Sequence, residues 1–86
     1  MNTNVIEEKV YLKTPQDVKD FCYAAGTLPR TVSVKVIHNE YVVDGKSILG
    51  MFSLNLSEPV TVQFTGNNKL DSTEIRNIFK SWTVGE

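Results

Sequence analysis

Residues 43–54 read VDGKSILGMFSL, and they combine a turn, a helix start and a run of apolar side chains within twelve positions. Asp44-Gly45 predicts a turn after the β-branched residues that end at Val43, because aspartate and glycine favour turn conformations. Ser47 is a residue type that accepts a hydrogen bond from the free amides at a helix start. We therefore predict a short helix that begins at Ser47 or next to it.

This short helix has two apolar faces. At about 100° per residue, Met51 and Leu54 fall on one face together with Gly50. The opposite face carries three further apolar side chains: Ile48, Leu49 and Phe52. One face can enter a core, so we expect the other to be covered or to bind a partner.

Upstream of this stretch, the pattern predicts one strand and one helix. Residues 5–13 favour a strand because their apolar side chains mostly alternate. Residues 14–17 (TPQD) then start a helix, with threonine as the cap, proline at the first helical position and aspartate in the first turn. Gly26 and Pro29 stop this helix, whose apolar stripe consists of Val18, Phe21, Cys22 and Ala25.

The remaining segments complete the order of elements. Residues 31–37 and 41–43 predict a hairpin with its turn at residues 38–40, and residues 60–64 alternate as a fourth strand. Residues 71–74 (DSTE) have the spacing of a capping box, and the apolar stripe that follows consists of Ile75, Ile78, Phe79 and Trp82. The order β-α-β-β-α-β-α predicts an α+β fold of two layers, as a single domain over residues 1–86.

Composition narrows the class of protein. The 86 residues carry nine basic and ten acidic side chains, without the basic excess that nucleic-acid binding uses, so we expect no nucleic-acid partner. One cysteine excludes an internal disulfide, as is usual in a reducing cytosol. No apolar stretch approaches the roughly 20 residues of a membrane span. We expect a cytoplasmic protein with no membrane association.

The spacing of the candidate residues excludes a phosphate-binding loop and a metal site. Gly45-Lys46-Ser47 resembles the end of a phosphate-binding loop, but Glu40 stands where that motif needs its first glycine. The single histidine, His38, and the single cysteine, Cys22, fall in different elements, so we expect no metal site and no cofactor. We interpret His38 as a solvated turn residue without an evident partner.

No catalytic constellation remains. Cys22 fits better as a small core residue than as a reactive thiol. Glu7 and Glu8 are neighbours in a strand and point to opposite faces, which is poor geometry for two carboxylates that act together. Phe79 and Trp82 fit the core of the last helix better than a ligand-binding site. We therefore expect a protein that is not an enzyme.

The order of elements and the run Asp44-Gly45-Lys46-Ser47-Ile48-Leu49-Gly50 resemble the HPr family of the bacterial phosphotransferase system, most strongly over residues 32–64. The resemblance implies an HPr-like open-faced β-sandwich, with three helices on one face of a four-stranded antiparallel sheet. It also implies two phosphorylation sites, of which one has a match in this chain.

The carrier site of that family depends on a histidine at the start of the first helix, with an arginine and a proline. The matching positions here are Gln16, Val18 and Lys19. A glutamine amide is not nucleophilic at neutral pH, so it cannot take and give a phosphoryl group as an imidazole does. The chain thus resembles a divergent member of the family that lacks the active-site histidine, similar to its catabolite-repression paralogue.

The second site of the family is a regulatory serine, which matches Ser47. The resemblance implies an ATP-dependent serine kinase, a transcription regulator or a phosphotransferase-system component as protein partners. The docking surface is expected to consist of Lys46, Ile48, Leu49 and Phe52. The plain alternative for Ser47 is a helix cap alone, worth about 1 kcal/mol.

Three functional hypotheses follow from the sequence. The leading one is a non-catalytic HPr-like regulatory or adaptor protein. The second is a phosphocarrier that uses a non-standard acceptor, such as His38. The third is a small α+β interaction domain unrelated to sugar transport, since fold resemblance alone does not fix function. The sequence leaves the oligomeric state open.

Overall fold

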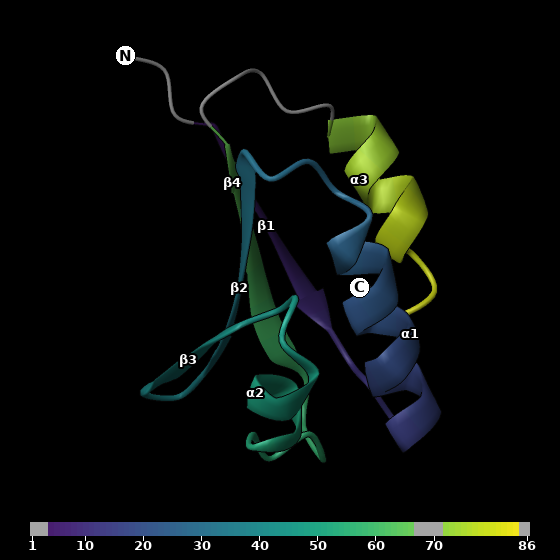
Figure 1. The fold of residues 1–86 in the computed structure, drawn as a ribbon. Helices are drawn as coiled ribbons and strands as arrows, with labels where there is room; N and C mark the ends of the chain where they lie inside the picture. The colour runs from purple at the N-terminus through teal and green to yellow at the C-terminus, as the bar shows by residue number, and fades with distance from the viewer. Residues whose placement is uncertain (1–3, 67–71, 85–86) are drawn as a thin grey trace.

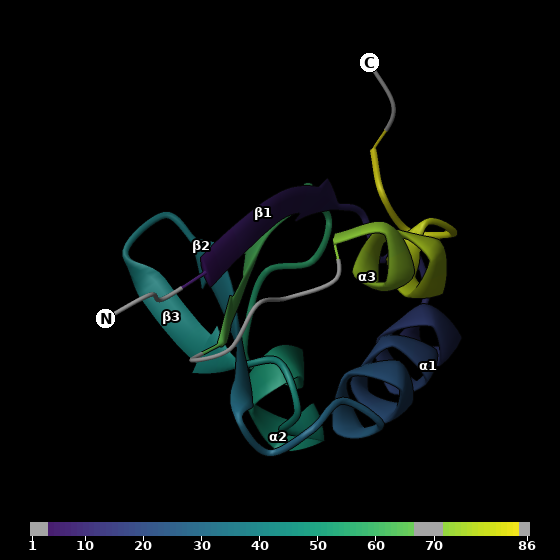
Figure 2. The same cartoon turned by 90° about the horizontal axis from the view of Figure 1, so that it is seen from above.

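The computed structural model describes residues 4–66 and 72–84, and its elements follow the predicted order. The strands are β1 (Asn4–Val10), β2 (Val32–His38), β3 (Tyr41–Asp44) and β4 (Val60–Gly66); the helices are α1 (Pro15–Gly26), α2 (Ile48–Phe52) and α3 (Ser72–Phe79). The strands form one antiparallel sheet in the order β1-β4-β2-β3, and the helices lie on one side of it (Figures 1 and 2). The predicted α+β fold is confirmed.

The core lies between the sheet and the helices. Every second side chain of the strands points toward the helices, and these side chains form one side of the core. Val36 of β2 is opposite both Val43 of β3 and Val62 of β4, so these residues share the face that the helices cover. Along β4, Val60, Val62 and Phe64 are buried. The predicted stripe of α1 supplies the opposing layer, since all four of its members are buried: Val18, Phe21, Cys22 and Ala25.

Aromatic side chains join α1, α3 and β4. The ring of Phe79 lies 4.9 Å from that of Phe64 and 5.2 Å from that of Phe21, measured between centroids, and both pairs are tilted. All three rings are fully buried. Each buried side chain of this size contributes roughly 1.5–3 kcal/mol, so these contacts fix α3 on the sheet beside α1.

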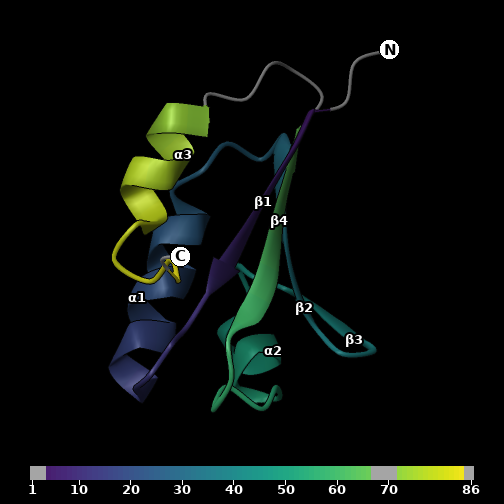
Figure 3. The same cartoon turned by 180° about the vertical axis from the view of Figure 1, so that it is seen from behind.

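Strand β1 ends at Val10 rather than at the predicted Lys13. Val10 is opposite Val60, the first residue of β4, and Pro59 before it has no amide N–H with which to extend the ladder. The C-terminal segment takes over the pairing, since Tyr11 donates to the Trp82 carbonyl and Val84 donates to the Lys9 carbonyl, both at 2.8 Å. Figure 3 shows β1 and β4 side by side from the other side of the molecule.

The β2–β3 turn is shorter than predicted. His38 is the last residue of β2 and pairs with Tyr41, so its placement in the turn was wrong. Asn39 adopts a positive φ of 55°, a conformation that asparagine tolerates better than most residues. Because Asn39 accepts that conformation, Asn39 and Glu40 suffice to reverse the chain.

Two sequence predictions fall at the edge of the described residues. The predicted capping box begins at Asp71, which lies outside them, whereas α3 itself begins at Ser72 as expected. Within the described residues, no helix has the length and apolar content needed to cross a membrane.

Candidate functional site

A tight turn carries the chain from β3 to α2. The Asp44 carboxylate accepts the Lys46 backbone N–H at 2.9 Å, and the Asp44 carbonyl accepts the Ser47 N–H at 3.0 Å. Gly45 donates its own N–H to the Val34 carbonyl at 2.7 Å, so the turn stays attached to β2. These bonds place Ser47 at the start of α2, as predicted.

Ser47 caps α2. Its backbone is extended (φ −103°, ψ 111°), and its Oγ accepts the Gly50 N–H at 3.2 Å. The Ser47 carbonyl accepts the Met51 N–H at 2.9 Å, which closes the first helical turn. The side chain is exposed. Its oxygen therefore accepts one bond within the protein and is still accessible from solvent.

The two predicted faces of α2 separate as expected. Met51 is fully buried in the core, whereas 38% of Ile48, 82% of Leu49 and 46% of Phe52 is exposed. We call Ile48, Leu49 and Phe52 the α2 apolar face. The helix therefore exposes three of its four large apolar side chains and buries the fourth.

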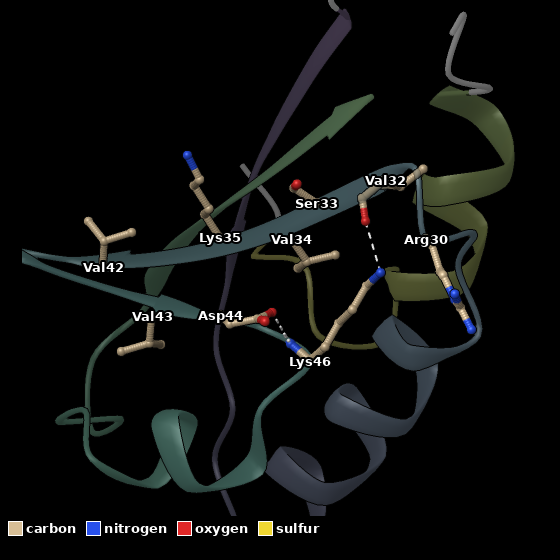
Figure 4. A pocket seen from close by; sticks show the side chains of 9 residues that line it. All are labelled: Arg30, Val32, Ser33, Val34, Lys35, Val42, Val43, Asp44 and Lys46. Carbon is tan, nitrogen blue, oxygen red and sulfur yellow. Dashed lines mark hydrogen bonds between the residues drawn. The ribbon is translucent and has the colours of Figure 1, made fainter. Parts of the chain in front are cut away.

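The Lys46 side chain extends from the start of α2 toward the beginning of β2 (Figure 4). Its ammonium donates to the Val32 carbonyl at 2.8 Å and lies 3.4 Å from the Pro29 carbonyl. These carbonyls belong to the connection from α1 to β2, so Lys46 ties that connection to the start of α2. Sequence reasoning missed this long-range contact.

The positions that match the carrier site lie in the first turns of α1, where they serve the helix. Gln16 donates through Nε2 to Asp20 at 2.9 Å, Val18 is buried in the core, and Lys19 is exposed. These side chains provide a helical hydrogen bond, a core contact and a solvated charge.

The start of α1 is closed by reciprocal bonds. Thr14 Oγ1 accepts the Asp17 N–H at 3.1 Å, and the Asp17 carboxylate accepts the Lys13 N–H at 3.1 Å. The predicted Thr14 cap is confirmed. The cap uses the Asp17 amide and Pro15 has no N–H, so two of the first-turn positions have no amide left for a bound anion.

A pocket of about 340 Å³ separates the start of α1 from the segment that follows α2. Phe52 lies both in this pocket and on the α2 apolar face, so the two surfaces are continuous. Sequence reasoning missed the pocket, because residues from two segments far apart in the sequence form its wall: Leu12, Lys13, Thr14, Pro15, Val18, Phe52, Leu54, Leu56 and Ser57.

Comparison with known proteins gives the fold a name. No protein-family model and no curated protein matches this chain. Among solved structures, it is similar to HPr-C-His from Thermoanaerobacter tengcongensis, with a TM-score of 0.60 and 21% sequence identity over 94% of this chain and 93% of that one. The chain has an HPr-like fold. At this identity, the similarity establishes the fold alone.

Within the HPr-like fold, His38 has a partner that the sequence did not reveal. Its Nε2 lies 2.9 Å from the Glu58 carboxylate, and only 11% of its side chain is exposed. The interpretation of His38 as a solvated turn residue without a partner was therefore wrong. The contact spans 20 residues and holds the segment before β4 against the end of β2.

Cys22 and the neighbouring glutamates of β1 lie as the sequence predicts. Burial raises the pKa of the Cys22 thiol, and the negative charge of Asp44 adds to the increase, so the thiol is held in its neutral form. Glu7 accepts a hydrogen bond from Gln63 on the open face of the sheet, whereas Glu8 pairs with Arg76 of α3. The two carboxylates thus serve opposite faces of the HPr-like sheet.

Proposed function

We propose that this protein is a non-catalytic, HPr-like regulatory or adaptor protein, which binds a protein partner through the α2 apolar face and carries Ser47 as a phosphorylatable switch. The observation that carries the proposal is the exposure of Leu49, with 82% of its surface open to solvent between the partly exposed Ile48 and Phe52. The HPr-like fold supports protein partners in general.

The α2 apolar face has the chemistry of an interface centre. Its three side chains carry no charge, and burying them against a partner releases water from apolar surface. The pocket behind Phe52 adds a concave region next to the convex helix. Apolar anchors that enter such a pocket dominate the affinity of many interfaces.

Ser47 is placed for modification beside this surface. A phosphate on its exposed oxygen would carry a charge near −2 at the start of α2, where a partner's arginine or lysine could recognise it. The phosphate oxygens could still accept the Gly50 N–H, so the helix keeps a cap. The switch would change the surface charge next to the α2 apolar face without refolding the chain.

The first turn of α1 supports a non-catalytic role. Gln16, Val18 and Lys19 occupy the positions that match the carrier site, and two of these side chains are a non-nucleophilic amide and a hydrocarbon. By resemblance, the partners are a serine kinase, a transcription regulator or a phosphotransferase-system component.

Incubation with an HPr-type serine kinase and ATP, followed by mass spectrometry of peptides, tests the switch. We expect one phosphate on Ser47 and none in a Ser47→Asn variant, which keeps a capping side chain but has no hydroxyl. An unmodified Ser47 would remove the switch from the proposal.

Docking is tested separately with purified kinase and regulator. Leu49→Ser should weaken binding at least about tenfold, whereas Leu49→Met, which keeps the apolar surface, should bind like the native protein. Equal binding by Leu49→Ser and the native protein would overturn the docking role of α2, whatever the result at Ser47.

A further inference from the structure

A second pocket, of about 400 Å³, lies along β2 and β3 and is lined by no residue of α2 (Figure 4). The β2–β3 ladder ends at the pair Lys35–Asp44, whereas β2 itself begins three residues earlier, at Val32. After Gly45 the chain turns away toward α2, so β3 leaves the first residues of β2 uncovered. A notch results along the start of β2.

Three of the nine residues that line this notch are basic. Arg30, Lys35 and Lys46 line the notch together with one acidic residue, Asp44, which gives a local charge of +3 − 1 = +2. The whole chain has a net charge of −1, so the positive charge is concentrated here. Such a concentration on a concave surface attracts small anions.

Lys46 is fixed in place by the backbone. Its ammonium donates to the Val32 carbonyl at 2.8 Å and lies 3.4 Å from the Pro29 carbonyl. An ammonium group has three N–H donors, so a third is left for a ligand. The cation therefore needs little rearrangement to bind an anion.

Other donors on the wall have no partner within the part of the chain that the structure describes. The guanidinium of Arg30 and the hydroxyl of Ser33 form no hydrogen bond or ion pair with the described residues, and both side chains are exposed. A guanidinium can bind two oxygens of a phosphate or carboxylate at once. Arg30 and Lys46 lie toward the same end of the notch (Figure 4).

Apolar side chains form the rest of the wall. Val42 is 57% exposed and Val43 is half-buried, whereas Val32 and Val34 border the pocket with only 6% and 2% of their surface exposed. The notch is larger than a phosphate group requires and falls at the lower end of the range for small-molecule sites. It therefore has room for a small organic group next to the bound anion.

We propose that this notch binds the phosphate monoester of a small organic molecule, with Arg30 and Lys46 on the phosphate and the exposed surface of Val42 and Val43 against the organic part. A monoester carries a charge of about −1.5 to −2 at neutral pH, which balances the local +2. Asp44 opposes the anion, although one of its oxygens already accepts the Lys46 N–H. The site is independent of the docking role proposed for α2.

Titration with glycerol 3-phosphate and with inorganic phosphate, followed by NMR of the backbone amides at constant ionic strength, tests the site. We expect saturable shifts confined to residues 30–35 and 42–46, with tighter binding of glycerol 3-phosphate. Arg30→Gln should weaken binding about tenfold, because it removes a charge-assisted contact. Lys80→Gln, which removes an exposed charge outside the notch, should leave binding unchanged.

Asp44→Asn should change the affinity for phosphate in the opposite direction. The asparagine oxygen still accepts the Lys46 N–H, but the negative charge is gone, so the affinity for phosphate should rise several-fold. Absence of saturation at millimolar ligand would overturn the proposal, as would shifts spread over lysines outside the notch. Equal losses in Arg30→Gln and Lys80→Gln would overturn it as well, because they would indicate general ionic attraction.

Discussion

Gly45 lies so close to Val34 that a side chain at position 45 would overlap the valine. Its N–H donates to the Val34 carbonyl at 2.7 Å, and a Cβ atom on Gly45 would lie 2.5 Å from Val34 Cγ1. Its φ is not positive, so the requirement for glycine is steric rather than conformational. Val34 is 2% exposed and has little freedom to move aside.

Replacing Gly45 should therefore destabilise the fold. Gly45→Ala forces a methyl group into the buried Val34 side chain, and we expect the free energy of unfolding to fall by about 1–3 kcal/mol in urea denaturation. Gly26→Ala is the matched control, because no atom lies within 4 Å of the position that its methyl group would occupy, and alanine favours the helix. That variant should be unchanged or more stable by up to about 1 kcal/mol. Equal stability of the two variants would contradict the packing argument.

The Ser47 cap should contribute measurably to stability. Ser47→Ala leaves the Gly50 N–H without its side-chain acceptor, so we expect a loss of about 1 kcal/mol in the free energy of unfolding. Ser47→Asn should retain most of the stability, since asparagine also caps. If both variants lost the same amount in urea denaturation, the cap would not be the source of the effect. The pair also separates stability from phosphorylation, because neither side chain can be phosphorylated.

The two sides of α2 should respond differently to substitution. Leu49→Ser changes an exposed side chain and should alter stability by no more than about 0.5 kcal/mol. Met51→Ala removes a fully buried side chain and should cost about 2–5 kcal/mol. Urea denaturation of both variants measures the contrast. A Leu49→Ser variant that is strongly destabilised would show that Leu49 supports the fold.

The elements were predicted well from the sequence because their signals are local. Period-two alternation located β2 and β4, and the caps at Thr14 and Ser47 involve residues only three positions apart. Asp44-Gly45 likewise predicted the turn. The steric reason for Gly45 stayed hidden, because it depends on contact with Val34 in another strand.

The contacts within the candidate sites were harder to predict from the sequence, since they join residues that are far apart along the chain. Lys46 reaches carbonyls 14 and 17 residues away, and His38 meets Glu58 across 20 residues. The sequence pattern did locate the α2 apolar face, because one helical turn is enough to separate Leu49 from Met51. Neither pocket could be predicted, as each is enclosed by segments that only the tertiary structure brings together.

Cys22 should make the fold sensitive to alkaline pH. Burial raises the pKa of its thiol above the ordinary value of 9.0, and the charge of Asp44 raises it further. The folded state therefore holds the thiol proton more tightly than the unfolded state. The stabilising contribution is fully present below the unfolded pKa and is lost as pH rises through the folded pKa. We expect the free energy of unfolding to decrease above about pH 9.

A Cys22→Ala variant isolates this contribution, because lysines and tyrosines titrate alike in both proteins. The stability advantage of the native protein over Cys22→Ala, measured by urea denaturation from about pH 7 to about pH 10, should shrink as pH rises. Asp44→Asn removes the second cause of the raised pKa, so the loss of this advantage should be smaller in that background. An advantage that stays constant over this range would show that the thiol titrates equally in the folded and unfolded states.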